Sequence, residues 1–212
     1  MADRSQQIIG LPPGASEETA GEDAKKYGTS NPVVRRLLDR LLHRLRLATS
    51  ECTGTFVDVG VGEGLALEAI GLQAAMLIGV EYRADKLAQA VARVPHLNGV
   101  QADAGLLPFR DRSVDLVTCI EVLEHLTAPE RAVAELARIC GGRTVISVPW
   151  EPFFRLGNLA RGKDIRRIGN NPEHIGQFTP GKLRRLLGAS FNDVEVHRCF
   201  PWLIAVASDP RV

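Results

Sequence analysis

The stretch Phe56-Val57-Asp58-Val59-Gly60-Val61-Gly62-Glu63-Gly64 decides the fold of this chain, because in it an apolar run gives way to three alternating glycines. The apolar part predicts a buried strand, and the glycines predict a tight turn after it. Glycine adopts backbone angles that other residues avoid, and it lets the main chain approach a ligand closely. We expect a helix to begin near Leu65, with its amide groups facing whatever fills the turn. Steric needs alone also produce such turns, so a second feature is required.

That second feature is the apolar run Met76-Leu77-Ile78-Gly79-Val80-Glu81, which also ends in an acid. A doubly wound sheet places a ribose-binding carboxylate at this position. The glycine spacing is GxGxG with an acid two residues ahead, whereas dinucleotide-binding dehydrogenases space their glycines as GxGxxG. The two features agree on a turn that cradles a nucleotide.

Asp58-x-Gly60-x-Gly62-x-Gly64 followed by Gly79-Val80-Glu81 resembles the class I S-adenosylmethionine-dependent methyltransferases, of the small-molecule, quinone-biosynthesis-like type. Residues 101–109 and 115–126 resemble the later motifs of that family, and they occur in the right order. The resemblance covers most of the chain from about Thr55 onward. It implies S-adenosyl-L-methionine as the cofactor.

The resemblance also implies roles for individual residues. Gly60, Gly62 and Gly64 would pass the methionine part of the cofactor, and Asp58 would fix the turn. Glu81 would accept hydrogen bonds from both ribose hydroxyls. Without a ligand, Glu81 is a solvated acid at a strand end.

Further cofactor contacts are implied elsewhere. Asp103 would bond the adenine amino group, with the Ala104 amide close to the ring, although Asp103 also suits a turn before Gly105. Tyr27 would lie near the cofactor entrance, or else serve as a packing anchor. The remaining expected contacts are Tyr82, Ile120 and Glu121.

Strand and helix patterns alternate from Thr55 onward, which predicts a parallel sheet with right-handed crossovers. The predicted fold is α/β, a Rossmann-like, doubly wound, seven-stranded and mostly parallel sheet with a closing antiparallel strand, plus an N-terminal helix. With 212 residues, 45% of them apolar, the chain suits one globular domain. The expected strands are 55–59, 76–80, 100–102, 114–120, 143–148, 194–198 and 203–207.

We expect residues 1–30 to form a loosely ordered tail and residues 31–212 to form the methyltransferase domain. Residues 149–180 are expected to be a substrate lid, because they are too long and varied for a simple connector. Thr179-Pro180 is typical of a helix cap and first turn. The chain shows no export signal or spanning apolar run, and its four cysteines are isolated, which predicts a reduced, cytoplasmic protein without a zinc site.

Asn31-Pro32 is typical of a helix start, and apolar residues recur after it at helical spacing. The other face of this helix is basic. It is expected to cover the sheet with a solvated outer face, the alternative being a role at a membrane surface. The basic residues are Arg35, Arg36, Arg40, Arg44 and Arg46.

Ligands of open parallel sheets bind beyond the carboxyl ends of the strands, so residues after the fourth and fifth strands should face the transferable methyl group. Glu121, His125 and His174 are the candidate catalytic residues. A neutral imidazole takes up a proton near neutral pH, and a base is needed if the acceptor must lose one. Alternatively, Glu124-His125 caps a helix or ties down a loop.

Glu121-x-x-Glu124-His125 also resembles the metal-binding triplet of the small-RNA 2′-O-methyltransferases. Two carboxylates and an imidazole could hold a divalent ion. That family adds a lid motif with two close histidines, whereas this lid has His174 alone. The same string is also widespread in metal-free small-molecule methyltransferases, so no metal is expected.

The resulting hypothesis is a methyltransferase that acts on a small-molecule acceptor, with O-methylation as the expected reaction. One alternative is a metal-assisted RNA 2′-O-methyltransferase whose groove is lined by the lid arginines. Another is a catalytically silent protein that only binds the cofactor. The formal net charge of +1 gives no general bias toward nucleic acid, which is therefore not the expected partner.

Overall fold

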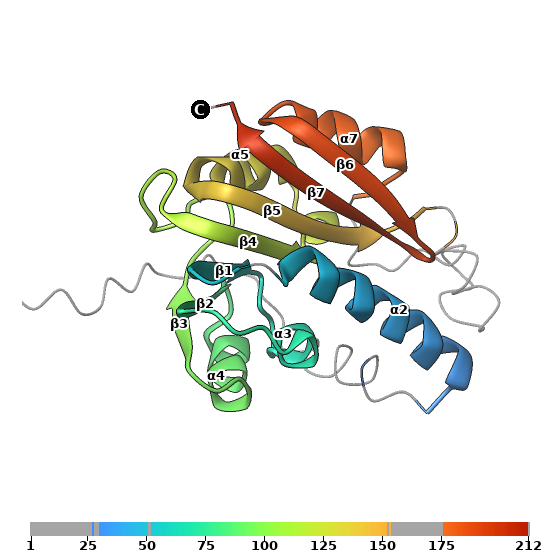
Figure 1. Ribbon diagram of the computed structural model, residues 1–212, viewed down its shortest axis with the longest axis horizontal. Coiled ribbons are helices and arrows are strands. Elements are labelled where there is room, and N and C mark those ends of the chain that lie inside the picture. Colours follow the sequence, from blue (N-terminus) through green and yellow to red (C-terminus); the bar gives the residue numbers. More distant parts are fainter. Residues whose placement is uncertain (1–26, 28–29, 51, 152, 154–175, 212) are drawn as a thin grey trace, which may run out of the picture.

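The protein is a three-layer α/β structure with a central seven-stranded sheet (Figure 1). The computed structural model describes residues 27, 30–50, 52–151, 153 and 176–211. The strands are β1 (Thr55–Val59), β2 (Met76–Glu81), β3 (Leu97–Gln101), β4 (Val114–Ile120), β5 (Cys140–Pro149), β6 (Phe191–Cys199) and β7 (Trp202–Pro210). The helices are α2 (Pro32–Thr49), α3 (Leu65–Ile70), α4 (Ala84–Arg93), α5 (Pro129–Ile139) and α7 (Pro180–Gly188), with a 3-10 turn at Leu123–His125.

The strand order is β3-β2-β1-β4-β5-β7-β6. The pairings from β3 to β5 are all parallel, and β7 runs antiparallel to both β5 and β6. The predicted fold is therefore confirmed, including the closing antiparallel strand.

The predicted third strand was placed too late in the chain. It spans Leu97–Gln101 rather than 100–102, and only Leu97 in it is buried. As an edge strand, β3 is held by its pairing with β2 over its whole length, and its sequence carries no apolar run that would reveal where it begins.

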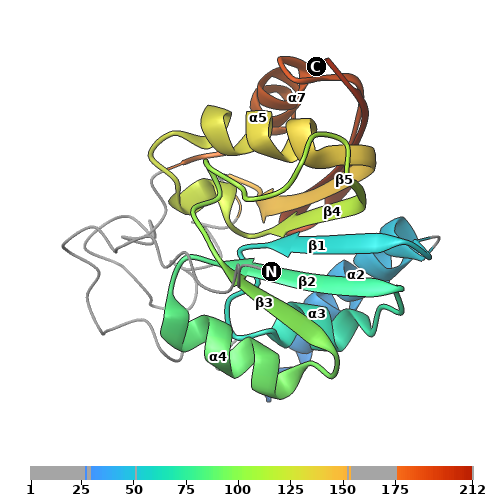
Figure 2. The same ribbon diagram turned by 90° about the vertical axis from the view of Figure 1, so that its left-hand side faces the viewer.

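Helices cover both faces of the sheet (Figure 2). Helices α2, α3 and α4 lie on one face, and α5 and α7 lie on the other. Side chains alternate between the two faces along β1, so Phe56 packs with the first group of helices while Val57 and Val59 pack with the second. Asp58 is therefore on the same face as Phe56.

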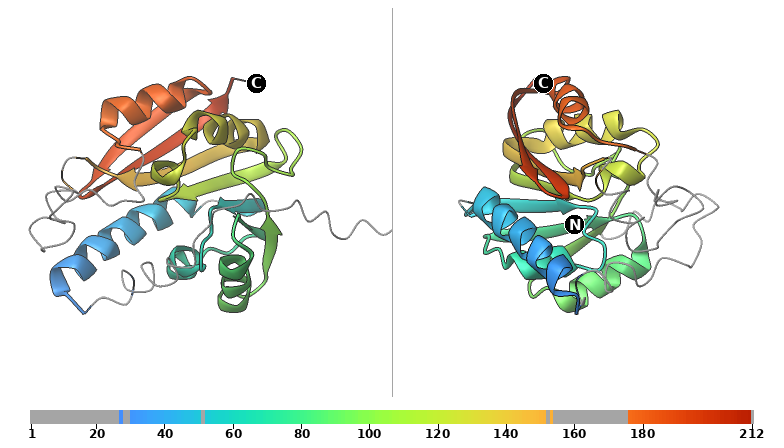
Figure 3. Two further views of the ribbon diagram at one scale, coloured as in Figure 1. Left: turned by 180° about the vertical axis from the view of Figure 1, so that it is seen from behind. Right: turned by 90° about the vertical axis from the view of Figure 1, so that its right-hand side faces the viewer.

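Helix α2 begins as the sequence predicts. The Asn31 side chain caps it by accepting hydrogen bonds from the amides of Val33 and Val34 at 3.0 and 3.3 Å. Figure 3 shows α2 lying along one side of the sheet. The apolar stripe of this helix is buried, and its other face is exposed. The buried positions are Leu38, Leu41, Leu42, Leu45 and Thr49.

The carboxyl ends of β1, β2, β4 and β5 share one edge of the sheet because these strands are parallel. Strand β7 starts at this same edge, since its first residue, Trp202, pairs with Pro149 at the end of β5. Ligands of such sheets bind at this edge. Within the described ranges, no helix combines the length and apolar character needed to cross a membrane.

Candidate cofactor site

The glycine turn after β1 has a backbone that requires glycine. Gly60 and Gly64 have φ angles of 79° and 80°, in the left-handed region. A Cβ at Gly60 would lie 2.3 Å from Cγ2 of Val122, and one at Gly64 would lie 3.0 Å from the backbone of Ala90. Larger residues would therefore both strain the turn and crowd the protein atoms packed against it.

The amide groups of the three glycines bind within the protein. Gly60 donates to the Val80 carbonyl at 2.8 Å, and Gly64 donates to the Val61 carbonyl at 2.9 Å. Gly62 donates to Oε2 of Glu81 at 3.0 Å. The turn thus offers a ligand its shape and close approach rather than these three donors.

Glu81 joins the glycine turn to the end of β2. The Gly62 amide donates to Oε2 of Glu81, and the Arg83 amide donates to Oε1 of Glu81 at 2.9 Å. A carboxylate has about four lone-pair sites, so each oxygen keeps capacity for a further donor. The partly buried carboxylate is therefore held in place by two backbone amides, and it can still accept hydrogen bonds from a diol.

Asp58 is buried at the end of β1, with 3% of its surface exposed. The Thr118 hydroxyl on β4 donates to its Oδ1 at 2.6 Å, as expected for residues paired across parallel strands. The pKa of Asp58 is raised to about 6, chiefly by burial; the Thr118 hydrogen bond opposes this shift, and the Glu81 charge adds to it. Thr118 is a neighbour that the sequence motif did not reveal.

Glu121 follows β4 in a backbone conformation with φ of 56°. Its amide donates to the Ser147 carbonyl at 2.9 Å, and its Oε1 accepts a hydrogen bond from the indole Nε1 of Trp202. Trp202 was not singled out in the sequence. Its position at the start of β7, next to β5, places it at the ligand-binding edge, and only the strand order reveals this.

Asp103 forms a turn before Gly105, which is the second of the two roles expected for it from the sequence. Its Oδ1 accepts from the Gly105 amide at 2.7 Å, and its side chain is exposed. Oδ1 is occupied, and Oδ2 has capacity to accept. Ala104 is half-buried and packs against the core.

The chain after Asp103 is held by Arg138 of α5, another residue missed in the sequence. Its guanidinium donates to the carbonyls of Leu107 and Phe109 at 2.9 and 2.8 Å. It also binds Glu135 and Asp111, each at 2.7 Å. The adjacent Arg138 guanidinium lowers the pKa of the Glu135 carboxyl. Glu135 in turn accepts from the Leu107 amide.

The other expected cofactor contacts differ in their surroundings. Ile120 is buried, and Tyr27 packs against the apolar cluster that contains the leucines of α2. The Tyr82 hydroxyl is buried and has no hydrogen-bond partner within the described residues. Such an orphaned group beside Glu81 fits a site that a polar ligand completes.

Two neighbouring residues of the turn after β4 differ in burial. His125 is exposed, whereas Glu124 is buried, with 1% of its surface exposed. Within the described residues, no group of three acidic, histidine or cysteine side chains is placed to hold a metal ion. His174 lies outside the described residues, as does most of the expected lid.

The described ends of the lid segment meet at the ligand-binding edge. Trp150 bridges to Phe178, and the Glu151 amide donates to the Phe178 carbonyl at 3.0 Å. The Gly176 amide donates to the Glu124 carbonyl at 2.8 Å. The segment therefore leaves and rejoins the domain beside the turn that follows β4.

These residues fit S-adenosylmethionine. Each Glu81 oxygen keeps capacity to accept from a ribose diol, and the Tyr82 hydroxyl is a buried polar atom without a hydrogen-bond partner within the described residues. The second carboxylate oxygen of Asp103 has capacity to accept from an amino group, as the resemblance would require for adenine.

Comparison with known proteins finds methyltransferases. Residues 57–146 match the family model described as a methyltransferase domain. A Mycobacterium tuberculosis protein named as a probable S-adenosylmethionine-dependent methyltransferase is 32% identical over 152 residues, which are 70% of this chain and 53% of that protein. A demethylmenaquinone methyltransferase of Beutenbergia cavernae is 28% identical, over 63% of this chain and 59% of that enzyme. The chain thus spans somewhat more than half the length of these relatives.

The fold has a close counterpart among solved structures. An S-adenosylmethionine-dependent methyltransferase from Archaeoglobus fulgidus superposes with a TM-score of 0.64 and 19% identity, over 87% of this chain and 97% of that one. At this identity the likeness concerns the fold alone.

Proposed function

Because the chain carries a class I S-adenosylmethionine-dependent methyltransferase domain, we propose that it transfers a methyl group to an oxygen of a small-molecule acceptor. One observation supports the cofactor half of the proposal: the Glu81 carboxylate, to which the resemblance gives the ribose, is held to the glycine turn through the Gly62 amide. The quinone-type relative supports a small acceptor.

When bound, the cofactor supplies an electrophilic methyl group together with its leaving group. The protein then has to align the acceptor and keep water away, and alignment is a large share of such catalysis. Glu121 is the carboxylate best placed to receive an acceptor proton, because it follows β4 at the ligand-binding edge and is oriented by Trp202. A hydroxyl acceptor has a proton to give to such a group.

The acceptor side of the site is apolar. Trp150, directly after β5, and Phe153 pack edge to face with ring centroids 4.8 Å apart. Aromatic walls with a few polar groups are typical of small-molecule pockets. His125 and His174 stay as candidate bases on the side of the lid.

The proposal is tested with cofactor labelled in its methyl group, incubated with the full chain and either phenolic and hydroquinone acceptors or RNA. Organic extraction recovers a methylated small molecule, and acid precipitation recovers methylated RNA. We expect label in the organic phase, and we expect the same amount when a chelator is present during the reaction. Label only in RNA, or a chelator-sensitive reaction, would favour the metal-assisted alternative, and cofactor binding without label in any product would favour a silent protein.

A further inference from the structure

Exposed aromatic rings gather where β6 turns into β7. Phe153 and Phe200 are 38% and 44% exposed, and their ring centroids lie 5.6 Å apart. The Arg198 guanidinium lies over the ring of Trp150, 5.4 Å from its centroid. Because Trp202 pairs with Pro149, this turn belongs to the edge of the sheet where an acceptor must enter. Contiguous exposed rings of this kind mark a surface that something covers.

The first half of α2 brings arginines to the same end of the molecule. The buried leucines of α2 share an apolar cluster with Cys199 and Trp202. The part of α2 that carries Arg40 and Arg44 therefore lies near the β6–β7 turn. Burial raises the pKa of the Cys199 thiol, and the charges of these two arginines oppose this effect.

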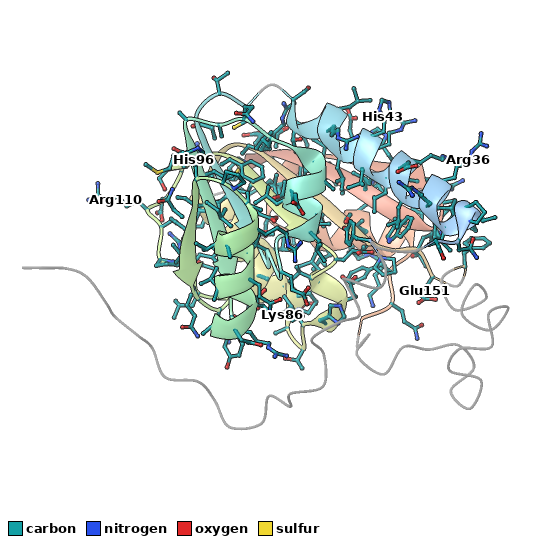
Figure 4. The ribbon with its side chains drawn as sticks, turned by 90° about the horizontal axis from the view of Figure 1, so that it is seen from below. Arg36, His43, Lys86, His96, Arg110 and Glu151 are labelled. Carbon is teal, nitrogen blue, oxygen red and sulfur yellow. The ribbon has the colours of Figure 1, made fainter. Side chains whose placement is uncertain are left out.

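The outer face of α2 combines charge with apolar surface. Arg36, Arg40 and Arg44 recur every four residues on the solvent side, and Val33, which is 67% exposed, lies beside them. Figure 4 shows Arg36 projecting outward from α2, at the same end of the molecule as Glu151. A surface hollow of about 290 Å³ is lined there by Pro32, Val33, Arg36, Leu37 and Arg40.

The positive charge is concentrated rather than general. Helix α2 holds five arginines and a single acid, Asp39, which gives it a formal charge of +4, while the whole chain carries +1. The rest of the chain is therefore net negative. Such an asymmetry directs one end of the molecule toward an anionic surface.

We propose that this end of the molecule docks on an anionic phospholipid surface. The arginines would bind lipid phosphates while the rings and the valine enter the headgroup region, so that the protein lies on the membrane without spanning it. We call this surface the arginine-aromatic end, and it comprises Val33, Arg36, Arg40, Phe153, Arg198 and Phe200.

Single-stranded nucleic acid is the other polyanion that binds arginines and aromatic rings. Bases stack on open ring faces. Here the rings lean edge to face on one another, with interplanar angles of 70° for Trp150 with Phe153 and 67° for Phe153 with Phe200, and Arg198 covers a face of Trp150. The exposed Val33 likewise suits acyl chains better than bases. The geometry favours lipid.

The proposal goes beyond methyl transfer and does not depend on it, because vesicle binding is measured without cofactor or acceptor. The experiment is co-sedimentation of the full chain with vesicles of phosphatidylcholine alone or mixed with phosphatidylglycerol, at low and high salt. We expect binding only to the mixed vesicles, and a loss of most of it at high salt.

Charge reversal in matched pairs locates the surface. Arg36→Glu with Arg40→Glu should lower the partition coefficient about tenfold or more, since each arginine near an anionic surface contributes roughly fivefold. Arg184→Glu with Arg185→Glu makes the same charge change on exposed positions of α7, on the opposite face of the sheet, and should leave binding nearly unchanged. Phe153→Ala with Phe200→Ala should remove the binding that survives high salt. Circular dichroism melting confirms that each variant is folded.

Three results would overturn the proposal. They are equal binding to neutral and anionic vesicles, an equal loss of vesicle binding in the two double-arginine variants, and no vesicle binding at all. Displacement of the protein from vesicles by a single-stranded RNA oligonucleotide at an affinity equal to that for lipid would also overturn it. That last result would assign the arginine-aromatic end to nucleic acid.

Discussion

The Gly62 amide donates a hydrogen bond to the Glu81 carboxylate at 3.0 Å, and this bond joins the glycine turn after β1 to the end of β2. The Arg83 amide occupies the other carboxylate oxygen at 2.9 Å. Glu81 therefore orders the turn, in addition to the ribose-binding role proposed for it. Truncation of Glu81 to alanine would leave two amides without their acceptor, and a loss of binding would not separate the two roles.

Glu81→Gln separates them better, because the amide oxygen still accepts one of the two backbone hydrogen bonds. We expect S-adenosylhomocysteine to bind about 10- to 100-fold more weakly, since hydrogen bonds to a charged acceptor contribute roughly 1.5 to 3 kcal/mol. Isothermal titration calorimetry measures the affinity. Glu195→Gln, at an exposed position on β6, is the matched control and should bind like the native protein. Equal affinities in both variants would contradict a ribose-binding role for Glu81.

Gly60→Ala should destabilise the protein by about 1 to 3 kcal/mol, because it combines a left-handed backbone with a clash against Val122. Urea unfolding measures the change. Gly181→Ala on α7 is the contrasting control, since a Cβ there meets nothing within 4 Å and should stabilise the helix by about 0.5 to 1 kcal/mol. Adding Val122→Ala to Gly60→Ala should recover part of the loss. If it recovers nothing, the clash is not the cause.

Local patterns predicted much of this fold. The apolar runs at Phe56 and Met76 mark the first two strands, and the caps at Asn31 and Thr179 begin helices where expected, with Thr179 accepting from the Lys182 amide. The glycine motif identifies its own turn because its requirement is local: a left-handed backbone needs glycine wherever it occurs.

Other parts of the site depend on which strands are neighbours, and no local pattern reveals that. Trp202 reaches Glu121 only because β7 enters the sheet beside β5. Arg138 binds the loop after Asp103 from a helix far along the chain. The carboxylates of Glu121 and Glu124 look alike in the sequence, yet one is partly exposed and the other is buried. That difference follows from the 3-10 turn at Leu123–His125.

Trp202→Phe should test the role of Glu121 in methyl transfer. The indole donates to the carboxylate, and donation to the charged form favours it, so the loss of this bond should raise the pH at which activity appears. The affinity for S-adenosylhomocysteine should stay close to native. A pH-rate profile of methyl transfer, together with calorimetry, distinguishes the two effects. An unchanged profile would exclude Glu121 as the proton acceptor.

Asp58→Asn should change how stability depends on pH. Burial raises the folded-state pKa of Asp58 to about 6 from an ordinary value of 3.8. A carboxyl whose pKa is raised on folding contributes most below its unfolded pKa, and this contribution is lost as the pH rises through the folded pKa. Between pH 4 and 7 the native protein should therefore lose about 2 to 3 kcal/mol of unfolding free energy relative to Asp58→Asn, whose amide does not titrate. Denaturant titrations of both proteins without cofactor measure this difference. Parallel stability curves would show that Asp58 is ionised at little cost, and that Thr118 and nearby dipoles compensate for its burial.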